Sequence, residues 1–310
     1  MSLLIRLIAA SVSVSNKAGM IIRDIMRRGE LNVVDKGIND LQTEADRSAQ
    51  RLIVSSLTRV FPKITVIGEE TLDNNDSGVD SLVTELDNNV LSFKCPQEYA
   101  DVKDEDIVVW VDPLDGTSEY TQGLLDHVTV LIGVAVKGEA VAGVIHQPYY
   151  NYKVEKDCSK LGRTIWGLVG LGAFGINKKQ PEEGKRIVTT TRSHGSKAIN
   201  EAIKAINPHE VIRVGGAGHK VLLVIEGEAH AYVFPSKGCK KWDICAPEAL
   251  LRSIGGKLTD VFGNNYSYLS TVNYENDSGV LATYSEAAHQ WYVDAIPVDI
   301  KASLLPKNCL

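Results

Sequence analysis

Cysteine is scarce in this sequence, and no two cysteines stand close together. The chain has five cysteines in 310 residues and no CxxC spacing. An odd count without paired spacing argues against a disulfide framework and against a zinc site. Reduced cysteines fit a cytoplasmic protein best. Cys309 is second from the end, whereas a prenylation motif needs its cysteine fourth from the end. The cysteines are Cys95, Cys158, Cys239, Cys245 and Cys309.

Excess positive charge is also missing. The formal net charge is −6 and the pI is about 5.7. A nucleic-acid polymer or an anionic membrane is therefore not expected as the main partner. A small polyanionic substrate is compatible with this charge if a bound metal ion supplies the positive charge.

The first 26 residues lack the features of a leader sequence. They are apolar, but no basic stretch precedes the apolar run, and Arg6, Lys17, Arg23 and Asp24 interrupt it. This pattern favours an amphipathic helix over a signal peptide. We expect no apolar run long enough to span a bilayer.

Apolar residues, at 44% of the chain, are sufficient for a large core, and the length allows about two domains. Strands and helices alternate in the second half, a pattern that gives a sheet covered by helices. We expect an α/β (α+β) fold with two closely packed subdomains, residues 1–155 and 156–310. In the second half, strands are expected at 187–191, 211–214, 229–234 and 279–283, and helices at 196–206, 220–226, 243–254 and 285–295.

The first half has a different pattern. Helical spacing predicts helices over 3–26 and from Thr43 to about Phe61, and alternation predicts a hairpin over 128–146. Residues 71–106 carry ten acidic residues and two basic ones. This segment reads as a solvated insertion that is partly helical around 81–91.

The most informative stretch is Trp110-Val111-Asp112-Pro113-Leu114-Asp115-Gly116-Thr117. It follows β-forming residues, so a strand delivers Asp112 and Asp115 to its C-terminal end, where Pro113 ends the ladder and Gly116 allows a sharp turn. Converging carboxylates favour a hard cation such as Mg²⁺. A helix that begins near Thr117 would present N–H groups to phosphate. A polar turn in which both carboxylates cap backbone N–H groups is the alternative for an isolated DxxD.

Two further acidic motifs make that alternative weaker. Glu69 and Glu70 end a short β-forming run, and Asp243 stands near the start of an expected helix. Thr43 and Asp46 resemble a helix-capping pair, and capping alone would account for Asp46.

Together, Gly68-Glu69-Glu70, the Asp112–Thr117 motif and Trp242-Asp243-Ile244-Cys245-Ala246 resemble the metal-dependent, lithium-sensitive phosphatases of the inositol monophosphatase superfamily. The resemblance extends from the first helix to about Thr283 and implies a layered αβαβα sugar-phosphatase-like fold. Thr190-Thr191-Arg192-Ser193-His194 and Gly215-Gly216-Ala217-Gly218 resemble the members that act on nucleotide bisphosphates. The implied reaction removes the 3′-phosphate of adenosine 3′,5′-bisphosphate, and a sulfated analogue is a second implied substrate.

The resemblance also implies roles for individual residues. Two to three Mg²⁺ ions are implied, with inhibition by Li⁺ near Asp46, and Asp46 would pair with Thr117 to handle the attacking water. Glu70 would lie behind the metal ligands and hold them in position. The chain is expected to be a monomer. The implied metal ligands are Glu69, Asp112, the Leu114 carbonyl, Asp115 and Asp243; the implied substrate contacts are Gly116, Thr117, Thr191, His194, Gly216 and Lys220.

Two other functions remain open at this point. An inositol phosphate phosphatase would keep the same metal site and change only the pocket. A non-catalytic nucleotide or lithium sensor would keep the fold without turnover. His194 and Lys220 also have plain alternatives as a helix cap and a solvated helix residue.

Overall fold

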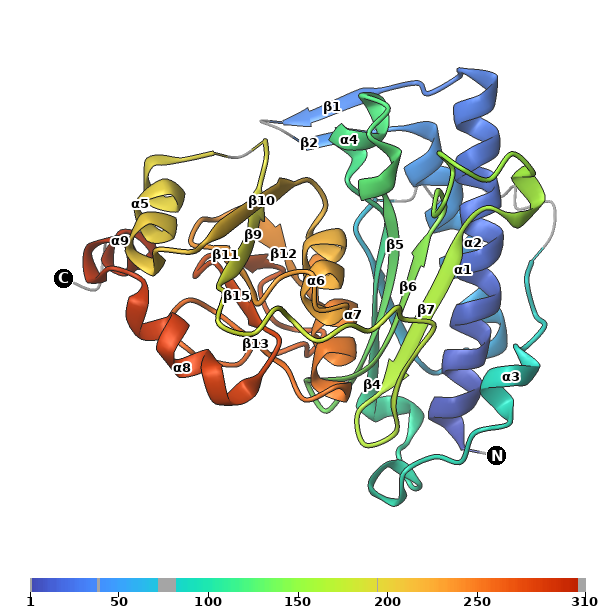
Figure 1. The fold of residues 1–310 in the computed structure, drawn as a ribbon. Helices are drawn as coiled ribbons and strands as arrows, with labels where there is room; N and C mark the ends of the chain where they lie inside the picture. Colours follow the sequence, from blue (N-terminus) through green and yellow to red (C-terminus); the bar gives the residue numbers. More distant parts are fainter. Residues whose placement is uncertain (1, 38–39, 72–81, 194, 306–310) are drawn as a thin grey trace.

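Helices and two sheets alternate in five layers (Figure 1). The computed structural model of the chain describes residues 2–37, 40–71, 82–193 and 195–305. The expected layered αβαβα arrangement is confirmed. One outer layer contains α1 (Leu3–Arg28) and α2 (Glu44–Val60), the middle layer α6 (Ala217–Ile225) and α7 (Lys241–Ser253), and the other outer layer α5 (Lys197–Ile206), α8 (Glu286–Ala295) and α9 (Val298–Leu304).

The first sheet has six strands in the order β3-β4-β5-β6-β7-β8. Only β3 and β4 pair in parallel; the other neighbours are antiparallel. The sheet continues to Phe174, and the proposed subdomain boundary at 155/156 stays a prediction. The strands are β3 (Thr65–Gly68), β4 (Ile107–Asp115), β5 (Thr129–Val136), β6 (Glu139–Gln147), β7 (Arg163–Leu168) and β8 (Gly172–Phe174).

Strand β4 is buried on both faces, which explains the unbroken apolar run from Ile107 to Val111. Val109 and Val111 join the core beneath α1 and α2. Val108 and Trp110 join the core that α6, α7 and the second sheet share. Successive side chains of a strand point to opposite faces, so a strand between two helical layers needs apolar residues throughout.

The second sheet has five strands in the order β10-β9-β11-β15-β13. β9 pairs in parallel with β10 and β11, whereas β15 is antiparallel to β11 and β13. The predicted strand–helix alternation of the second half is confirmed. Its strands are β9 (Ile187–Thr191), β10 (Glu210–Val214), β11 (Ala231–Phe234), β13 (Lys257–Thr259) and β15 (Val280–Thr283), and two small ladders pair β1 (Val34–Gly37) with β2 (Asp40–Gln42) and β12 (Cys239–Lys240) with β14 (Glu275–Asn276).

Helix α1 begins and ends where its capping residues predict. Ser2 accepts a hydrogen bond from the N–H of Ile5 at 3.4 Å, and Gly29 has a left-handed φ of 76°. By length and composition α1 could cross a membrane, which corrects the expectation that no such stretch exists. However, 67% of its most apolar 18-residue stretch is buried within the protein, as in a core helix.

The acidic segment has less helix than expected. Within its described part, residues 82–106, the α-helical stretch is α3 (Asn88–Leu91). The chain before it is tied to other elements instead, because the N–H of Val83 bonds to Ser56 and the N–H of Asp87 to the carbonyl of Ala9. The predicted helix around 81–91 is therefore limited to its last turn.

Glycines let α7 lie very close to the first sheet. A Cβ atom at Gly133 would lie 2.6 Å from the Ala246 nitrogen, and one at Gly143 would lie 2.4 Å from the Ala246 carbonyl oxygen. Only residues without a side chain permit this approach. The packing holds the first turn of α7, and Asp243 with it, beside the end of β4.

Candidate active site

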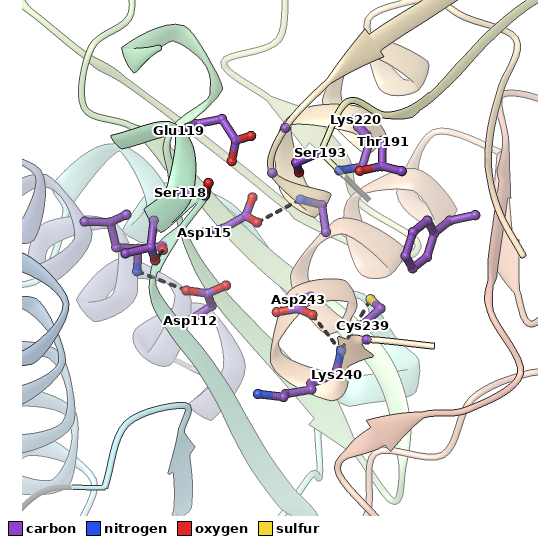
Figure 2. A pocket seen from close by; sticks show the side chains of 18 of the residues that line it. Asp112, Asp115, Ser118, Glu119, Thr191, Ser193, Lys220, Cys239, Lys240 and Asp243 are labelled. Carbon is purple, nitrogen blue, oxygen red and sulfur yellow. Dashed lines mark hydrogen bonds between the residues drawn. The ribbon is translucent and has the colours of Figure 1, made fainter. Parts of the chain in front are cut away.

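A cavity of about 470 Å³ opens where β4 ends and the first turns of α6 and α7 meet it. Figure 2 shows Asp112 and Asp243 near one another on its wall, with Lys220 and Thr191 farther along. Its volume is in the range of small-molecule sites. The predicted residues that line it are Glu69, Asp112, Leu114, Asp115, Gly116, Thr117, Thr191, Gly216, Lys220 and Asp243.

Three carboxylates from three elements converge in this cavity. Oxygens of Glu69, Asp112 and Asp243 all lie within 4.8 Å of one another. The parallel β3–β4 register places Gly68 opposite Val111, and the N–H of Glu69 bonds to the Val111 carbonyl at 3.0 Å. Glu69 and Asp112 therefore leave neighbouring strands side by side, and α7 brings Asp243 from the second half of the chain.

Burial makes this cluster costly to ionise without a cation. Burial, followed by the charge of Asp243, raises the pKa of Glu69 to about 8. Burial and then Glu69 raise the pKa of Asp112 well above its ordinary value. Burial also raises the pKa of Asp243 to about 6, although the Lys240 N–H donates to it at 2.6 Å. Closely spaced oxygens with this repulsion are suited to a hard divalent ion.

Asp115 lies beside this cluster and faces α6. Its two carboxylate oxygens accept hydrogen bonds from the N–H groups of Ala217 at 2.7 Å and Gly218 at 2.8 Å. The hydroxyl of Thr129 donates to it as well, at 2.7 Å. Asp115 therefore joins the carboxylate cluster to the N-terminus of α6, and its predicted role as a metal ligand stays a prediction.

Asp46 and Thr117 meet as predicted. The Thr117 hydroxyl lies 2.9 Å from Asp46 Oδ1 and 3.0 Å from the Leu114 carbonyl oxygen. Asp46 Oδ2 accepts from both the N–H and the hydroxyl of Thr43, so it caps α2 at the same time. Burial raises the pKa of Asp46 to about 6, and these hydrogen bonds oppose part of the rise.

The predicted substrate side has two backbone turns and a buried lysine. Gly116 and Gly216 have φ values of 88° and 69°, which favour glycine. Lys220 is 5% exposed, and burial lowers its pKa, while Asp115 opposes this. Thr191 is buried at the cavity wall. His194 lies outside the described residues.

Several cavity residues were not predicted. Ser118 and Glu119 follow the Asp112–Thr117 motif directly, so their position in the sequence was the available signal. Lys36, which is not among the lining residues, pairs with Glu70 at 2.8 Å and lies 3.4 Å from Glu69. No local pattern indicates this contact, because 33 positions separate Lys36 from Glu69. Further unpredicted lining residues include Ser193, Tyr232, Phe234 and Cys239.

Comparisons with known proteins agree with the three motifs. A family model for the inositol monophosphatase family matches residues 4–297. The chain is 52% identical over 306 residues to 3′(2′),5′-bisphosphate nucleotidase 1 of Homo sapiens, covering 98% of each protein. It is 40% identical to the protein of that name from Dictyostelium discoideum, covering 94% of this chain and 96% of the relative.

A solved structure agrees at the level of the fold. Extragenic suppressor protein suhB from Bartonella henselae superposes with a TM-score of 0.67 at 22% identity, covering 93% of this chain and 97% of the other. The family that the sequence motifs predicted is therefore confirmed: the chain belongs to the inositol monophosphatase family of phosphatases.

Proposed function

We propose that this protein removes the 3′-phosphate from adenosine 3′,5′-bisphosphate and releases AMP and phosphate. The observation that carries the proposal is the carboxylate cluster of Glu69, Asp112 and Asp243 in one cavity with the buried Lys220. The 52% identity to a protein named for bisphosphate nucleotide hydrolysis supports the choice of substrate. The sulfated analogue with the same 3′-phosphate is proposed as a second substrate.

The donor set suits Mg²⁺. Carboxylate oxygens that repel one another when buried are the ligands this ion prefers. Glu69, Asp112 and Asp243, with Asp115 and the Leu114 carbonyl, would hold two to three ions. When bound, Mg²⁺ would supply charge that neutralises the phosphate and acidifies water.

Asp46 and Thr117 are proposed to position the attacking water and to accept its proton. The Thr117 hydroxyl lies 2.9 Å from Asp46 Oδ1, so a proton can pass between them. The pKa of Asp46, about 6, is close to the working range of a general base at neutral pH. Phosphoryl transfer requires mainly positioning and electrostatics, which this arrangement provides.

Lys220 is proposed to bind the phosphate that remains on the product. A buried ammonium group next to a nucleotide-sized cavity is a strong point charge for phosphate. Gly216 lets the ligand approach the backbone, and Thr191 adds a hydroxyl at the wall. Li⁺ is proposed to inhibit by replacing a weakly held Mg²⁺ near Asp46.

Phosphate release from adenosine 3′,5′-bisphosphate and from inositol 1,4-bisphosphate, with Mg²⁺ and with or without Li⁺, tests this proposal. We expect release from the nucleotide, dependence on Mg²⁺ and loss of activity with Li⁺. Preference for the inositol compound would contradict the pocket assignment. Nucleotide binding without release from either compound would point to a sensor.

A further inference from the structure

Two histidines from different halves of the chain stack behind the turn that precedes α6. His127 ends the short helix η3 (Leu125–His127), next to β5, and His219 lies in the first turn of α6. Their ring centroids are 4.9 Å apart, with 22° between the ring planes. Neither is among the described residues that line the cavity. The stack thus connects the first sheet to the helix that carries Lys220.

His127 contacts the turn with both its ring and its backbone. Its Nδ1 accepts a hydrogen bond from the N–H of Gly215 at 3.2 Å. Its carbonyl oxygen would lie 2.7 Å from a Cβ atom at Gly216, so the two backbones are in close contact. A ring nitrogen that accepts carries no proton, so the neutral ring holds its proton on Nε2.

The Gly215–Gly216 turn also orients the start of α6. The N–H groups of Ala217 and Gly218 donate to Asp115 at 2.7 Å and 2.8 Å. Lys220 follows within the same helical turn. A shift of Gly215 would therefore move donors to Asp115 and the buried ammonium group together.

The surroundings keep both rings neutral. Burial lowers the pKa of His127; Glu119 and Asp126 oppose this, whereas Arg192 and Lys220 add to it. Burial, followed by His127, Lys220 and Arg163, lowers the pKa of His219 to about 3. The buried Nδ1 of His219 has no hydrogen-bond partner among the described residues, so this ring contributes through stacking.

We propose that His127, with His219 stacked on it, is a positioning residue that holds the Gly215–Gly216 turn and thereby sets the place of Lys220 for the substrate. The identity of the substrate in this statement rests on the proposed function. The contact itself does not, because it is defined by the Gly215 hydrogen bond and the ring stack.

Three variants separate the hydrogen bond from general packing. His127→Leu fills the space but removes the acceptor, whereas His127→Asn places an amide oxygen near the position of Nδ1. His209→Leu is the matched control, because His209 Nδ1 also accepts a backbone N–H, from Arg186 at 3.0 Å, outside the cavity.

We expect His127→Leu to raise the KM for adenosine 3′,5′-bisphosphate and the Kd for AMP by about three- to tenfold, the range of one hydrogen bond. Its kcat should stay within about twofold, because the groups proposed to handle the attacking water are unchanged. His127→Asn should retain most of the wild-type affinity, and His209→Leu should leave KM and Kd unchanged. A purely structural loss would lower the active fraction and leave KM and Kd alone.

Amide hydrogen exchange of residues 214–219, measured by mass spectrometry, provides a readout that needs no nucleotide. Exchange should be faster in His127→Leu and close to wild type in His127→Asn. Unchanged KM and exchange in His127→Leu, or equal losses in the Leu and Asn variants, would overturn the proposal. If the wild type hydrolyses no nucleotide, the proposed function fails, and the exchange result alone decides the role of His127.

Discussion

Asp46 shows how one side chain can have a structural and a chemical role. One carboxylate oxygen accepts a hydrogen bond from the N–H of Thr43 and so completes the cap of α2. The other accepts a hydrogen bond from the hydroxyl of Thr117. Asp46 lies in the first turn of α2, and its carboxylate is bonded to the N-cap residue Thr43, so its side chain is held in one position. The capping interpretation of Asp46 and the functional one are therefore compatible.

The Thr117 hydroxyl gives the first prediction at this scale. Thr117→Val keeps the shape of the side chain but removes the hydroxyl that links Asp46 with the Leu114 carbonyl. We expect kcat to fall by about 100-fold, the usual worth of a positioned proton acceptor, with little change in KM. Steady-state kinetics with Thr117→Ser as the control test this. A kcat within twofold of wild type in Thr117→Val would refute the assigned role.

Replacing Asp112 should raise the stability of the metal-free protein and lower its activity with Mg²⁺. Asp112→Asn replaces a buried carboxylate that Glu69 repels, and the amide oxygen can still accept the Leu114 N–H. The metal-free protein should gain about 1 kcal/mol, or roughly 2–4 °C in Tm. Activity with Mg²⁺ should fall by at least about 100-fold, because a metal ligand is lost. Melting curves in EDTA and in Mg²⁺ check both signs, and full Mg²⁺-dependent activity would exclude Asp112 as a ligand.

At the scale of elements, α6 is held at one end by the turn before β5 and at the other by β7, both of which belong to the layer of the first sheet. His127 contacts the turn at its start, and Arg163 on β7 makes a two-pronged ion pair with Glu226 at its end, at 2.7 Å and 2.8 Å. Both side chains of this pair are mostly buried, at 13% and 14% exposed. Two parallel hydrogen bonds between a guanidinium and a carboxylate are strong, and they also fix the orientation of the two groups.

Breaking the Arg163–Glu226 pair should therefore loosen the contact between α6 and the first sheet. Arg163→Met leaves a mostly buried carboxylate without its partner and should lower the free energy of unfolding by about 2–3 kcal/mol. The matched control is Lys185→Met, which removes an exposed ion pair with Glu182 and should leave stability unchanged. Denaturant melts measure both. Arg163→Met/Glu226→Gln should recover part of the loss, and no recovery would mean that packing rather than charge pairing matters here.

At the scale of the whole molecule, the buried acids predict how stability depends on pH without metal. Glu69 has a folded pKa of about 8 against an ordinary value of 4.5, so the folded state keeps a proton that the unfolded state has lost. Glu69 should therefore lower the stability as the pH rises from about 4.5 to 8, and Asp46 and Asp243 should do so up to about pH 6. The buried His146 and His219, with pKa values of about 3, act in the opposite direction below pH 6.5.

The metal-free protein should thus lose stability between about pH 6.5 and 8, where the two histidines are neutral in both states and no longer oppose the acids. Melting temperatures in EDTA should fall between about pH 6.5 and 8, and saturating Mg²⁺ should remove this decline, because a bound cation replaces the proton. The variant Glu69→Gln is the control and should show a smaller alkaline decline in EDTA than the wild type. A wild-type melting temperature that is flat or rises from pH 6.5 to 8 in EDTA would contradict the buried-acid cluster.

The sequence by itself determined the family, the five-layer fold and ten of the 22 residues that line the cavity. These depend on local signals: the Thr43–Asp46 cap that starts α2, the apolar strand that delivers Asp112, and the turn at Gly116. Local backbone preferences and side-chain periodicity act over a few residues, so they can be read from the chain alone.

Only the tertiary structure decided how residues far apart in the chain meet. It turned Asp115 toward the N–H groups of α6, paired Lys36 with Glu70 and stacked His127 on His219. It also limited the acidic segment's described α-helix to Asn88–Leu91. Such contacts depend on how sheets and helices pack, because the partners lie tens of positions apart and no short pattern specifies their distance or orientation.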